Sequence, residues 1–384
     1  MEKVTLNEMD EKIVAVVGMG MVTALGNNIS HTWQRLLLGE TGISLQQPFP
    51  ELPKLPLATV TPRPTSPLVL LEQALEMALA DAGYKTPVAD CGVVIGSSRS
   101  QQGLWEKWAA GNYLEREFPW LSSLPQMLAI EVAKKLGVTE LVSSPNAACA
   151  TSHWAIAKAV EWLQTEKCQR VIVGAVESCI SPLNIAGFAK LGALAKTGEY
   201  PFDKNREGMV LGEGAAVLIL ELQPIAHFRQ TKTYGRILGF GFSNDAYHRT
   251  ALDPDYQTAA TAIKNCLQRS QIATEQVSFI HTHGTGTRLN DQREANLIKA
   301  LFRNDTFIIS TKGATGHTLG ASGMLSAVFS LLALQQQILP PCVGLEKPEY
   351  NLNFVREAQT ASLKTALCLS FGFGGQNAVI AFGN

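Results

Sequence analysis

The chain has 384 residues and a formal net charge of −1, because 32 Lys and Arg residues nearly balance 33 Asp and Glu residues. With 46% hydrophobic residues, it is long and apolar enough to bury one large core or two smaller ones. The balanced charge argues against nucleic acid and against an anionic membrane surface as partners.

The ends and the cysteines indicate where the protein works. The first 12 residues are polar and acidic and lack the apolar core of a signal peptide, and no stretch approaches the roughly 18 uninterrupted apolar residues of a membrane span. The 7 cysteines are odd in number and contain no CxxC pair, which argues against a disulfide framework and a zinc site. We therefore expect a cytoplasmic protein with reduced cysteines.

Apolar runs rich in Val and Ile alternate with helical patterns along the first part of the chain. Strands are predicted at 12–20, 91–98, 170–177 and 215–222, and a helix is predicted at 66–84, where Gly83 precedes its end. Runs that are apolar on both faces are typical of parallel strands covered by helices on each side.

The second part repeats this alternation. Its predicted elements are a strand at 234–243, a helix at 256–271, strands at 277–284 and 306–313, a helix at 322–337 and a final strand pair at 366–383. No low-complexity linker separates the two parts. We therefore predict two α/β halves, residues 1–228 and 229–384, packed as one body.

One cysteine has an unusual setting. Cys149 lies in "NAACATSHWAIAKAVEWLQ" (146–164), among small residues immediately before a predicted buried helix. A helix N-terminus offers a positive dipole end and free backbone N–H groups, which favour a thiolate, and the small neighbours leave room for a substrate. The alternative is a buried structural cysteine, the commoner role of a thiol in apolar surroundings.

Two histidines follow predicted strands in the second half. His283 lies in "HTHGTGTRLNDQRE" and His317 in "STKGATGHTLGASG", each at a strand end among glycines. Open α/β sheets hold their active sites at such strand ends. A single histidine there is more often structural, whereas two of them together with Cys149 favour catalysis.

At this point the chain resembles the elongating β-ketoacyl-acyl carrier protein synthases of the thiolase superfamily, over nearly its whole length. The matching stretches include "VVGMGMVTALGN", "AACATS", "PFDKNREGMVLGEGAA", "HGTGTRLND", "STKGATGHTLGASG" and "SFGFGGQNA", in this order. The resemblance implies a thiolase-like five-layered αβαβα fold made of two pseudo-duplicated halves.

The resemblance also implies roles for individual residues. Cys149 is expected to accept the acyl group, His283 and His317 to complete a Cys-His-His triad, and Lys312 to match the family's active-site lysine. Glu294 and Asp291 are implied as supporting acids, and Glu294 is expected to pair with the lysine. Thr285 and Thr287 are expected to bind the phosphopantetheine arm. Phe371 and Phe373 are expected to contact substrate. The backbone N–H groups of Phe373 and Cys149 are expected to form an oxyanion hole.

The implied activity is an acyltransferase reaction, the decarboxylative Claisen condensation of an acyl-enzyme with malonyl-acyl carrier protein in fatty-acid or polyketide elongation. It requires no metal, nucleotide or redox cofactor, and its partners are an acyl carrier protein and a second subunit. A homodimer is expected; a heterodimer with a related ketosynthase in a specialised lipid or polyketide pathway is the alternative.

Other functions share this fold. A thiolase would carry a second cysteine in a CxG motif where "SFGFGG" stands, and a non-elongating chain-length partner or a malonyl decarboxylase usually lacks the nucleophilic cysteine. A zinc site of Cys149, His283 and His317 lacks paired-ligand spacing, and Lys312 would repel a cation.

Several further stretches are interpreted as scaffold or as divergent. Asp203, Arg206 and Glu213 are expected to be buried or turn-fixing polar residues. Residues 45–140 match the family poorly, and the Trp-rich segment 98–121 is expected to cap the acyl tunnel. The acyl chain length, the carrier and the pathway are not indicated by the sequence.

Overall fold

The computed structural model describes residues 12–112, 117, 119–250 and 252–384. Its main sheet has 11 strands and consists of two halves with the same pattern of neighbours. The strands of the first half, in spatial order, are β1 (Val14–Thr23), β7 (Glu213–Leu222), β6 (Arg170–Ser178), β4 (Gly92–Gly96) and β5 (Val142–Ser143). Those of the second half are β8 (Gly235–Asn244), β15 (Gln376–Gly383), β14 (Thr365–Gly372), β9 (Phe279–His281), β10 (Phe307–Ile309) and β12 (Asn353–Phe354).

The two halves repeat the same strand directions. In the first half β1, β7 and β6 pair antiparallel and β6, β4 and β5 pair parallel. In the second half β8, β15 and β14 pair antiparallel, while β14, β9 and β10 pair parallel. The halves join where β1 pairs with β8 at Val14, Ala15 and Val16. The prediction of parallel strands was therefore wrong for the runs at 12–20 and 215–222, because a run that is apolar on both faces indicates burial and not direction.

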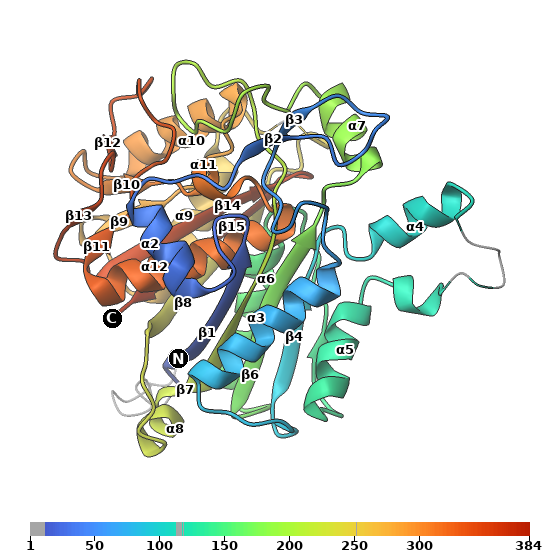
Figure 1. Cartoon of the computed structure of the whole chain (residues 1–384). Helices are drawn as coiled ribbons and strands as arrows, with labels where there is room; N and C mark the ends of the chain where they lie inside the picture. The colour runs from blue at the N-terminus through green and yellow to red at the C-terminus, as the bar shows by residue number, and fades with distance from the viewer. Residues whose placement is uncertain (1–11, 113–116, 118, 251) are drawn as a thin grey trace.

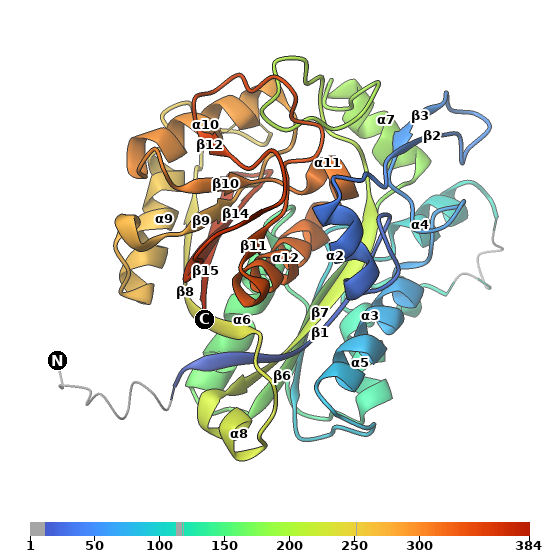
Figure 2. The ribbon, with the colours of Figure 1, turned by 60° about the vertical axis from the view of Figure 1, so that its left-hand side comes forward.

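Helices cover both faces of each half, and one pair of helices lies between the halves (Figure 2). Together they form the layers α, β, α, β and α, which confirms the predicted five-layered arrangement. The outer helices of the first half are α3 (Pro67–Asp81) and α5 (Met127–Leu136). The central pair is α6 (Thr151–Gln164) and α12 (Ser322–Gln336). The outer helices of the second half are α9 (Gln257–Ser270) and α10 (Arg288–Leu301).

Alternating side chains of β1 divide between two cores. Val14 and Val16 pack into the core around α6 and α12, whereas Ala15 and Val17 pack into the core under α3 and α5. Successive side chains of a strand point to opposite faces, so a run that is apolar at every position suits a sheet covered on both sides. A third core lies between the second half and α9.

Helix α12 is the apolar centre of the molecule. Its side chains are buried from Ser322 through Leu334, as expected for a helix that is apolar on all sides. The 18-residue segment Leu319–Gln336 is apolar and long enough to cross a membrane, but 89% of it is buried inside the protein. This segment is therefore explained as a core helix.

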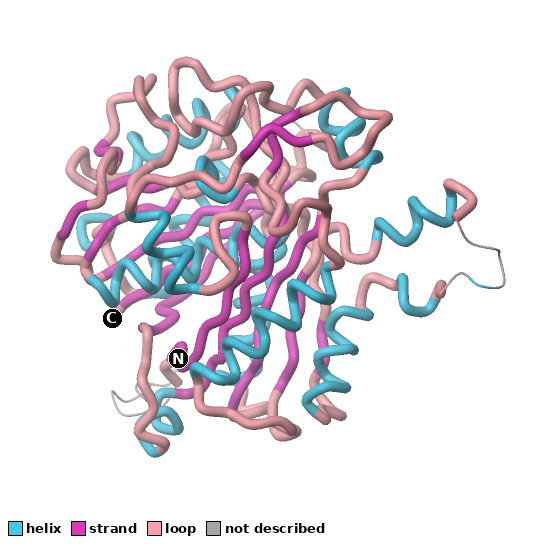
Figure 3. The backbone as a smooth tube through the Cα atoms, viewed as in Figure 1, coloured by secondary structure: helices cyan, strands magenta, loops and turns pink. Residues whose placement is uncertain are grey.

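The remaining elements are short and lie mostly around the ends of the strands (Figure 3). They are α2 (Ile29–Leu37), β2 (Ser44–Gln46), β3 (Leu55–Leu57), α4 (Gln102–Ala109), η2 (Leu121–Ser123), α7 (Pro182–Lys190), α8 (Gln223–Phe228), η3 (Thr274–Gln276), α11 (Lys312–Thr315), η4 (Leu319–Ala321), β11 (Ile338–Leu339) and β13 (Gln359–Thr360). Helix α4 has no buried residue and extends away from the body (Figure 1).

Candidate active site

Cys149 lies on a sharp turn directly before α6. Ala148 has a positive φ of 50°, a conformation that residues with a side chain rarely adopt. The Thr151 hydroxyl holds this turn, since it accepts a hydrogen bond from the N–H of Ala147 at 2.8 Å and donates one to the carbonyl oxygen of Ala148 at 2.6 Å. The thiol is therefore presented at the start of a helix, where backbone N–H groups are not used within the helix.

The second half of the molecule supports this turn. The Ser370 hydroxyl donates a hydrogen bond to the carbonyl oxygen of Cys149 at 2.9 Å. A Cβ atom at Gly372 would lie 2.8 Å from the oxygen of Ala147 and 3.2 Å from the nitrogen of Cys149. Only glycine therefore allows the end of β14 to approach the nucleophile turn so closely.

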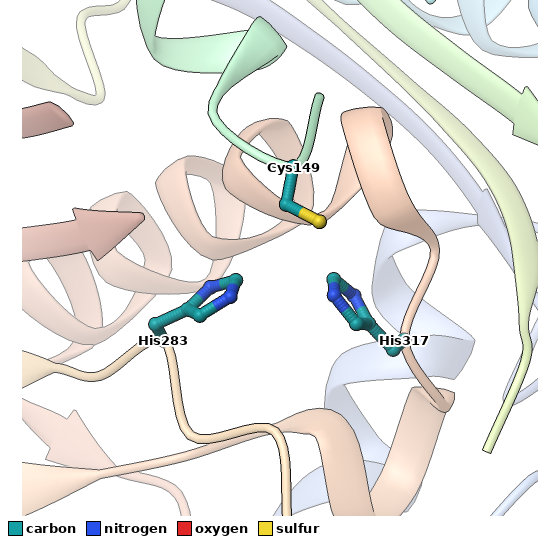
Figure 4. Close-up of side chains that lie close together, drawn as sticks. All are labelled: Cys149, His283 and His317. Carbon is teal, nitrogen blue, oxygen red and sulfur yellow. The ribbon is translucent and has the colours of Figure 1, made fainter. Parts of the chain in front are cut away.

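His283 and His317 face Cys149 across a small gap (Figure 4). The two imidazole rings lie 5.3 Å apart between centroids and are nearly perpendicular, at 82°. The Cys149 sulfur and the nearest ring nitrogens of both histidines all lie within 4.8 Å of one another. The structure thus brings together the three residues that the sequence predicted as a triad.

Backbone contacts fix His283. The Glu294 carboxylate accepts hydrogen bonds from the N–H of His283 at 2.6 Å and of Gly284 at 2.8 Å. The Lys312 ammonium donates a hydrogen bond to the carbonyl oxygen of His283. Among the described residues Lys312 forms no direct ion pair, so Glu294 supports the histidine turn instead of binding the lysine directly.

His317 is oriented by its own neighbours. Gly316 has a φ of 65°, and the backbone N–H of His317 donates to the carbonyl oxygen of Val210 at 2.7 Å. Nδ1 of His317 lies 2.9 Å from the Ser322 hydroxyl, which leaves Nε2 as the nitrogen available to a ligand. The ring is thus held by a hydrogen bond on its far side.

Burial controls the protonation of the three side chains. It lowers the pKa of His283 and of His317 well below 6.5, and the Lys312 ammonium lowers both values further. Burial raises the pKa of the Cys149 thiol to about 11, against the opposing influence of Lys312 and Arg99. At neutral pH the resting site therefore contains two neutral imidazoles and a thiol, and an imidazole can take up the thiol proton.

The predicted acid Asp291 supports a different loop. Its carboxylate accepts a hydrogen bond from the N–H of Phe202 at 2.7 Å and lies 3.4 Å from Nε of Arg206. Burial raises the pKa of Asp291 to about 6. Asp203 in turn accepts hydrogen bonds from the N–H groups of Glu346 and Lys347, at 2.9 and 2.6 Å. Asp203 and Arg206 of the "PFDKNREG" segment are thus buried polar residues that hold this loop, as expected.

A cavity of about 360 Å³ opens onto the three side chains. Its lining contains the predicted triad and the predicted substrate-binding residues: Cys149, His283, His317, Thr285, Thr287, Phe371 and Phe373. Lys312, Glu294 and Asp291 lie buried beneath this surface and do not line the cavity. The walls carry more apolar than polar side chains, which suits an acyl chain.

The Trp-rich segment does not line this cavity. No described residue of 98–121 is part of its wall, and residues 113–116 and 118 lie outside the described residues. Trp105 and Trp108 instead pack edge to face with ring centroids 6.2 Å apart. The expectation that this segment caps the tunnel therefore stays a prediction.

Two buried acids near the site were missed by the sequence analysis. Glu177, at the end of β6, accepts hydrogen bonds from the N–H groups of Ser98 and Arg99, each at 2.9 Å, and from that of Gly320 at 3.0 Å. It therefore links the two halves next to His317. Glu199 is 1% exposed, and its backbone packs against Gly313, the residue after Lys312. An isolated Glu in a strand or loop is most often exposed, so neither position carried a signal.

The same three side chains could be read as metal ligands. Cys149, His283 and His317 offer one sulfur and two nitrogen atoms within 4.8 Å, which is close enough for a tetrahedral cation. The buried Lys312 ammonium acts against a cation by charge repulsion, the same effect that helps to lower the pKa of both histidines. The expectation of no metal stays a prediction.

Comparisons with known proteins agree with this geometry. The family model "Beta-ketoacyl synthase, N-terminal domain" matches residues 11–65 and 59–224, and "Beta-ketoacyl synthase, C-terminal domain" matches residues 234–346. The 3-oxoacyl-(acyl-carrier-protein) synthase 2 of Coxiella burnetii is 34% identical over 413 residues, which cover 97% of this chain and 98% of that protein. The corresponding protein of Vibrio harveyi is 32% identical over 412 residues, covering 97% and 99%.

Solved structures give the same result. The ketosynthase in "AntDE:AntF (apo): type II PKS acyl-carrier protein in complex with its ketosynthase bound to the hexaketide" matches with a TM-score of 0.89 at 28% identity, covering 97% of this chain and 99% of that one. A beta-ketoacyl synthase from Burkholderia phymatum matches with a TM-score of 0.87 at 25% identity and the same coverage. The chain therefore belongs to the beta-ketoacyl synthase family, which confirms the resemblance found in its sequence.

Proposed function

We propose that this protein is an acyltransferase that joins an acyl group to malonyl-acyl carrier protein by decarboxylative Claisen condensation, yielding a β-ketoacyl-acyl carrier protein. The observation that carries the proposal is the convergence of Cys149, His283 and His317 at one end of a largely apolar cavity. The curated relatives are named 3-oxoacyl-(acyl-carrier-protein) synthases, which supports this reaction.

In the first half-reaction the Cys149 sulfur attacks the thioester carbon of an acyl carrier. A neutral histidine accepts the thiol proton, and the oxyanion binds the backbone N–H groups of Cys149 and Phe373. A donor of this kind contributes about 3 kcal/mol to stabilising such a transition state. The new carbon–sulfur bond forms on Cys149 and the carbon–sulfur bond to the carrier breaks. The histidine returns its proton to the carrier sulfur, and the carrier departs as a thiol.

In the second half-reaction malonyl carrier enters the same cavity. The bond between its carboxylate and the adjacent carbon breaks, carbon dioxide leaves, and the electron pair remains as an enolate. Nε2 of His317 and the ring of His283 stabilise the enolate oxygen by hydrogen bonds. The enolate carbon then attacks the acyl carbon on Cys149, the carbon–sulfur bond breaks, and the Cys149 thiolate takes up a proton from water.

An acyl carrier protein is the proposed partner. The ketosynthase of the AntDE:AntF structure is in complex with an acyl carrier protein, and this chain is similar to it over 97% of its length. Thr285 and Thr287 line the cavity with their hydroxyl oxygens 2.9 Å apart, which suits hydrogen bonds to the amides of a phosphopantetheine arm. This route uses no metal or other cofactor. A dimer and a cytoplasmic location stay predictions.

The chain keeps Cys149 and both histidines, which favours an elongating enzyme over a non-elongating chain-length partner. An active subunit of a heterodimer remains the alternative. Solution mass measurement of the purified chain alone separates them: a homodimer is expected, and a monomer that becomes active only with a second ketosynthase would support the heterodimer.

The test of the proposed function is product formation. Purified protein is incubated with acyl carriers of graded chain length and malonyl carrier, and the products are measured by mass spectrometry. We expect a β-ketoacyl carrier that is longer by two carbon atoms, and no product from Cys149→Ala or His317→Ala. The control is Cys168→Ala, because that cysteine lies outside the cavity. No product at any chain length would contradict the proposal.

A further inference from the structure

Glu199 is a buried carboxylate with an incomplete set of hydrogen bonds. It is 1% exposed, and one oxygen, Oε2, accepts a hydrogen bond from the N–H of Val210 at 3.0 Å. The other oxygen, Oε1, is buried and has no hydrogen-bond partner among the described residues. Burying a carboxylate in this way is costly unless a nearby positive charge compensates it.

The surroundings of Glu199 place it beside the catalytic turns. A Cβ atom at Gly286 would lie 3.3 Å from Cγ of Glu199, so the side chain packs against the loop that follows His283. A Cβ atom at Gly313 would lie 3.1 Å from the Glu199 carbonyl oxygen, so its backbone packs against the residue after Lys312. Glu199 is thus held between the two segments that carry the histidines.

Lys312 is the positive charge at this position. Its side chain is buried, and Glu199 makes the largest favourable contribution to its charged form, ahead of Glu294. Glu294 already accepts hydrogen bonds from two backbone N–H groups with its two oxygens. Glu199, in contrast, has one buried oxygen, Oε1, that no described donor occupies.

We propose that Glu199 is a positioning residue whose carboxylate is the counter-charge that keeps Lys312 protonated beneath the two histidines. This inference rests on the proposed function, since it explains how the histidines are kept neutral for that reaction. The titratable and charged groups facing Lys312 and Glu199 are Glu294, Asp291, Cys149, His283, His317, His281 and His153, with Arg206 beside Asp291.

Glu199 and Lys312 can share one proton in two ways, as a charged pair or as a neutral acid beside a neutral amine. Burial raises the pKa of Glu199 well above 4.5 and lowers the pKa of Lys312, so burial alone would favour a neutral acid beside a neutral amine. Mutual attraction favours the charged pair instead, and attraction is strong where water is excluded. At neutral pH we therefore expect both Glu199 and Lys312 to be charged.

Glu199→Gln distinguishes these arrangements, because glutamine has the shape of the protonated acid but carries no charge. We would measure the rate of Cys149 alkylation by iodoacetamide from pH 6 to 9 on the full chain without substrate. Without the counter-charge Lys312 loses its proton at lower pH, and Cys149 loses the cation that favours its thiolate. A rise of one unit in the thiol pKa gives about tenfold slower alkylation, and we expect a slowing of about threefold to tenfold at pH 8.

Two further variants separate charge from shape. Glu199→Asp keeps the charge, so its alkylation profile should stay close to that of the wild type. Glu207→Gln is the matched control: it lies in the same segment, is exposed, and accepts hydrogen bonds only from Lys196 and Thr197 among the described residues. In a Lys312→Met background, Glu199→Gln should cause no slowing, because the cation on which it acts is absent.

An unchanged alkylation profile in Glu199→Gln would overturn the proposal, because Glu199 would then already carry a proton. Equal slowing in Glu199→Gln and Glu199→Asp would also overturn it, since shape alone would explain the effect. If Glu199→Gln does not fold, Glu199→Asp compared with Glu199→Asn provides the same contrast. Alkylation needs no acyl carrier, so failure of the condensation assay leaves this test intact.

Discussion

The buried ammonium of Lys312 donates a hydrogen bond to the backbone carbonyl oxygen of His283. This contact joins the start of α11 to the loop after β9 and brings a positive charge close to His283 and His317. Because a cation disfavours a second positive charge nearby, Lys312 lowers the pKa of His283 and of His317. One side chain thus fixes both the position of a histidine and the charge of the pair.

Removing this charge should make the enzyme more sensitive to acid. In Lys312→Met the pKa of each histidine should rise towards 6.5, so the neutral form is lost at a higher pH than in the wild type. We expect the acid limb of the pH–rate profile of condensation to move upward, so that the rate falls most below about pH 6.5 and changes less than about twofold at pH 7. Lys204→Met, an exposed residue, is the control, and an unchanged acid limb in Lys312→Met would refute this explanation.

Gly372→Ala should disturb the nucleophile turn. The added methyl group would lie 2.8 Å from the oxygen of Ala147 and 3.2 Å from the nitrogen of Cys149, and both are backbone atoms that cannot rotate away. Because small displacements of reacting groups are costly, kcat should fall by about 100-fold. Gly187→Ala on α7 is the control, since its added methyl group meets nothing within 4 Å. Equal activity of the two variants would contradict the close contact.

Glu177→Ala should destabilise the protein, because it leaves the buried donors of residues 97–99 and of Gly320 without their shared acceptor. Each unsatisfied buried donor costs about 1–3 kcal/mol, so we expect the free energy of unfolding in urea to fall by about 3 kcal/mol or more. Glu161→Ala on α6 is the control, because Glu161 forms only a surface pair with Lys158 and should cost at most about 1 kcal/mol. A loss of about 3 kcal/mol or more in both variants would be inconsistent with this role of Glu177 as a shared acceptor.

Glu294 should contribute to the pH dependence of stability. Burial raises its pKa from 4.5 to about 7, so the folded state binds more protons than the unfolded state between these values. The stabilisation is complete below the unfolded pKa and is lost as the pH rises through about 7. Glu294→Gln should therefore show a smaller decrease in unfolding free energy from pH 4.5 to 7, by up to about 3 kcal/mol. The control is the exposed Glu140→Gln; an unchanged slope in Glu294→Gln would argue against the raised pKa.

The strands and long helices could be predicted because the spacing of their apolar side chains follows which faces are buried. The run at 215–222 lies within β7, and the pattern at 66–84 became α3, with Pro67 at its first position and Gly83 at a φ of 72° beyond its end. Strand direction could not be predicted in this way. The antiparallel pairing of β7 with β1 depends on long-range connections, which local periodicity does not record.

The predicted catalytic residues could be found because motifs mark strand ends and the start of α6. Glu177 and Glu199 could not, because their roles depend on partners that are distant in the sequence. Glu177 binds the N–H of Gly320, which lies 143 residues away, and Glu199 acts on Lys312. Such pairings arise only when the two halves pack together.

The most direct test of the account is whether Cys149 itself accepts the acyl group. Intact-mass and peptide mass spectrometry would follow the wild type and Cys149→Ala after addition of an acyl carrier and then of malonyl carrier. The account predicts one acyl group on Cys149 of the wild type, none on the variant, and loss of that group when malonyl carrier is added. Acyl transfer to Cys149→Ala, or to another cysteine of the wild type, would contradict it.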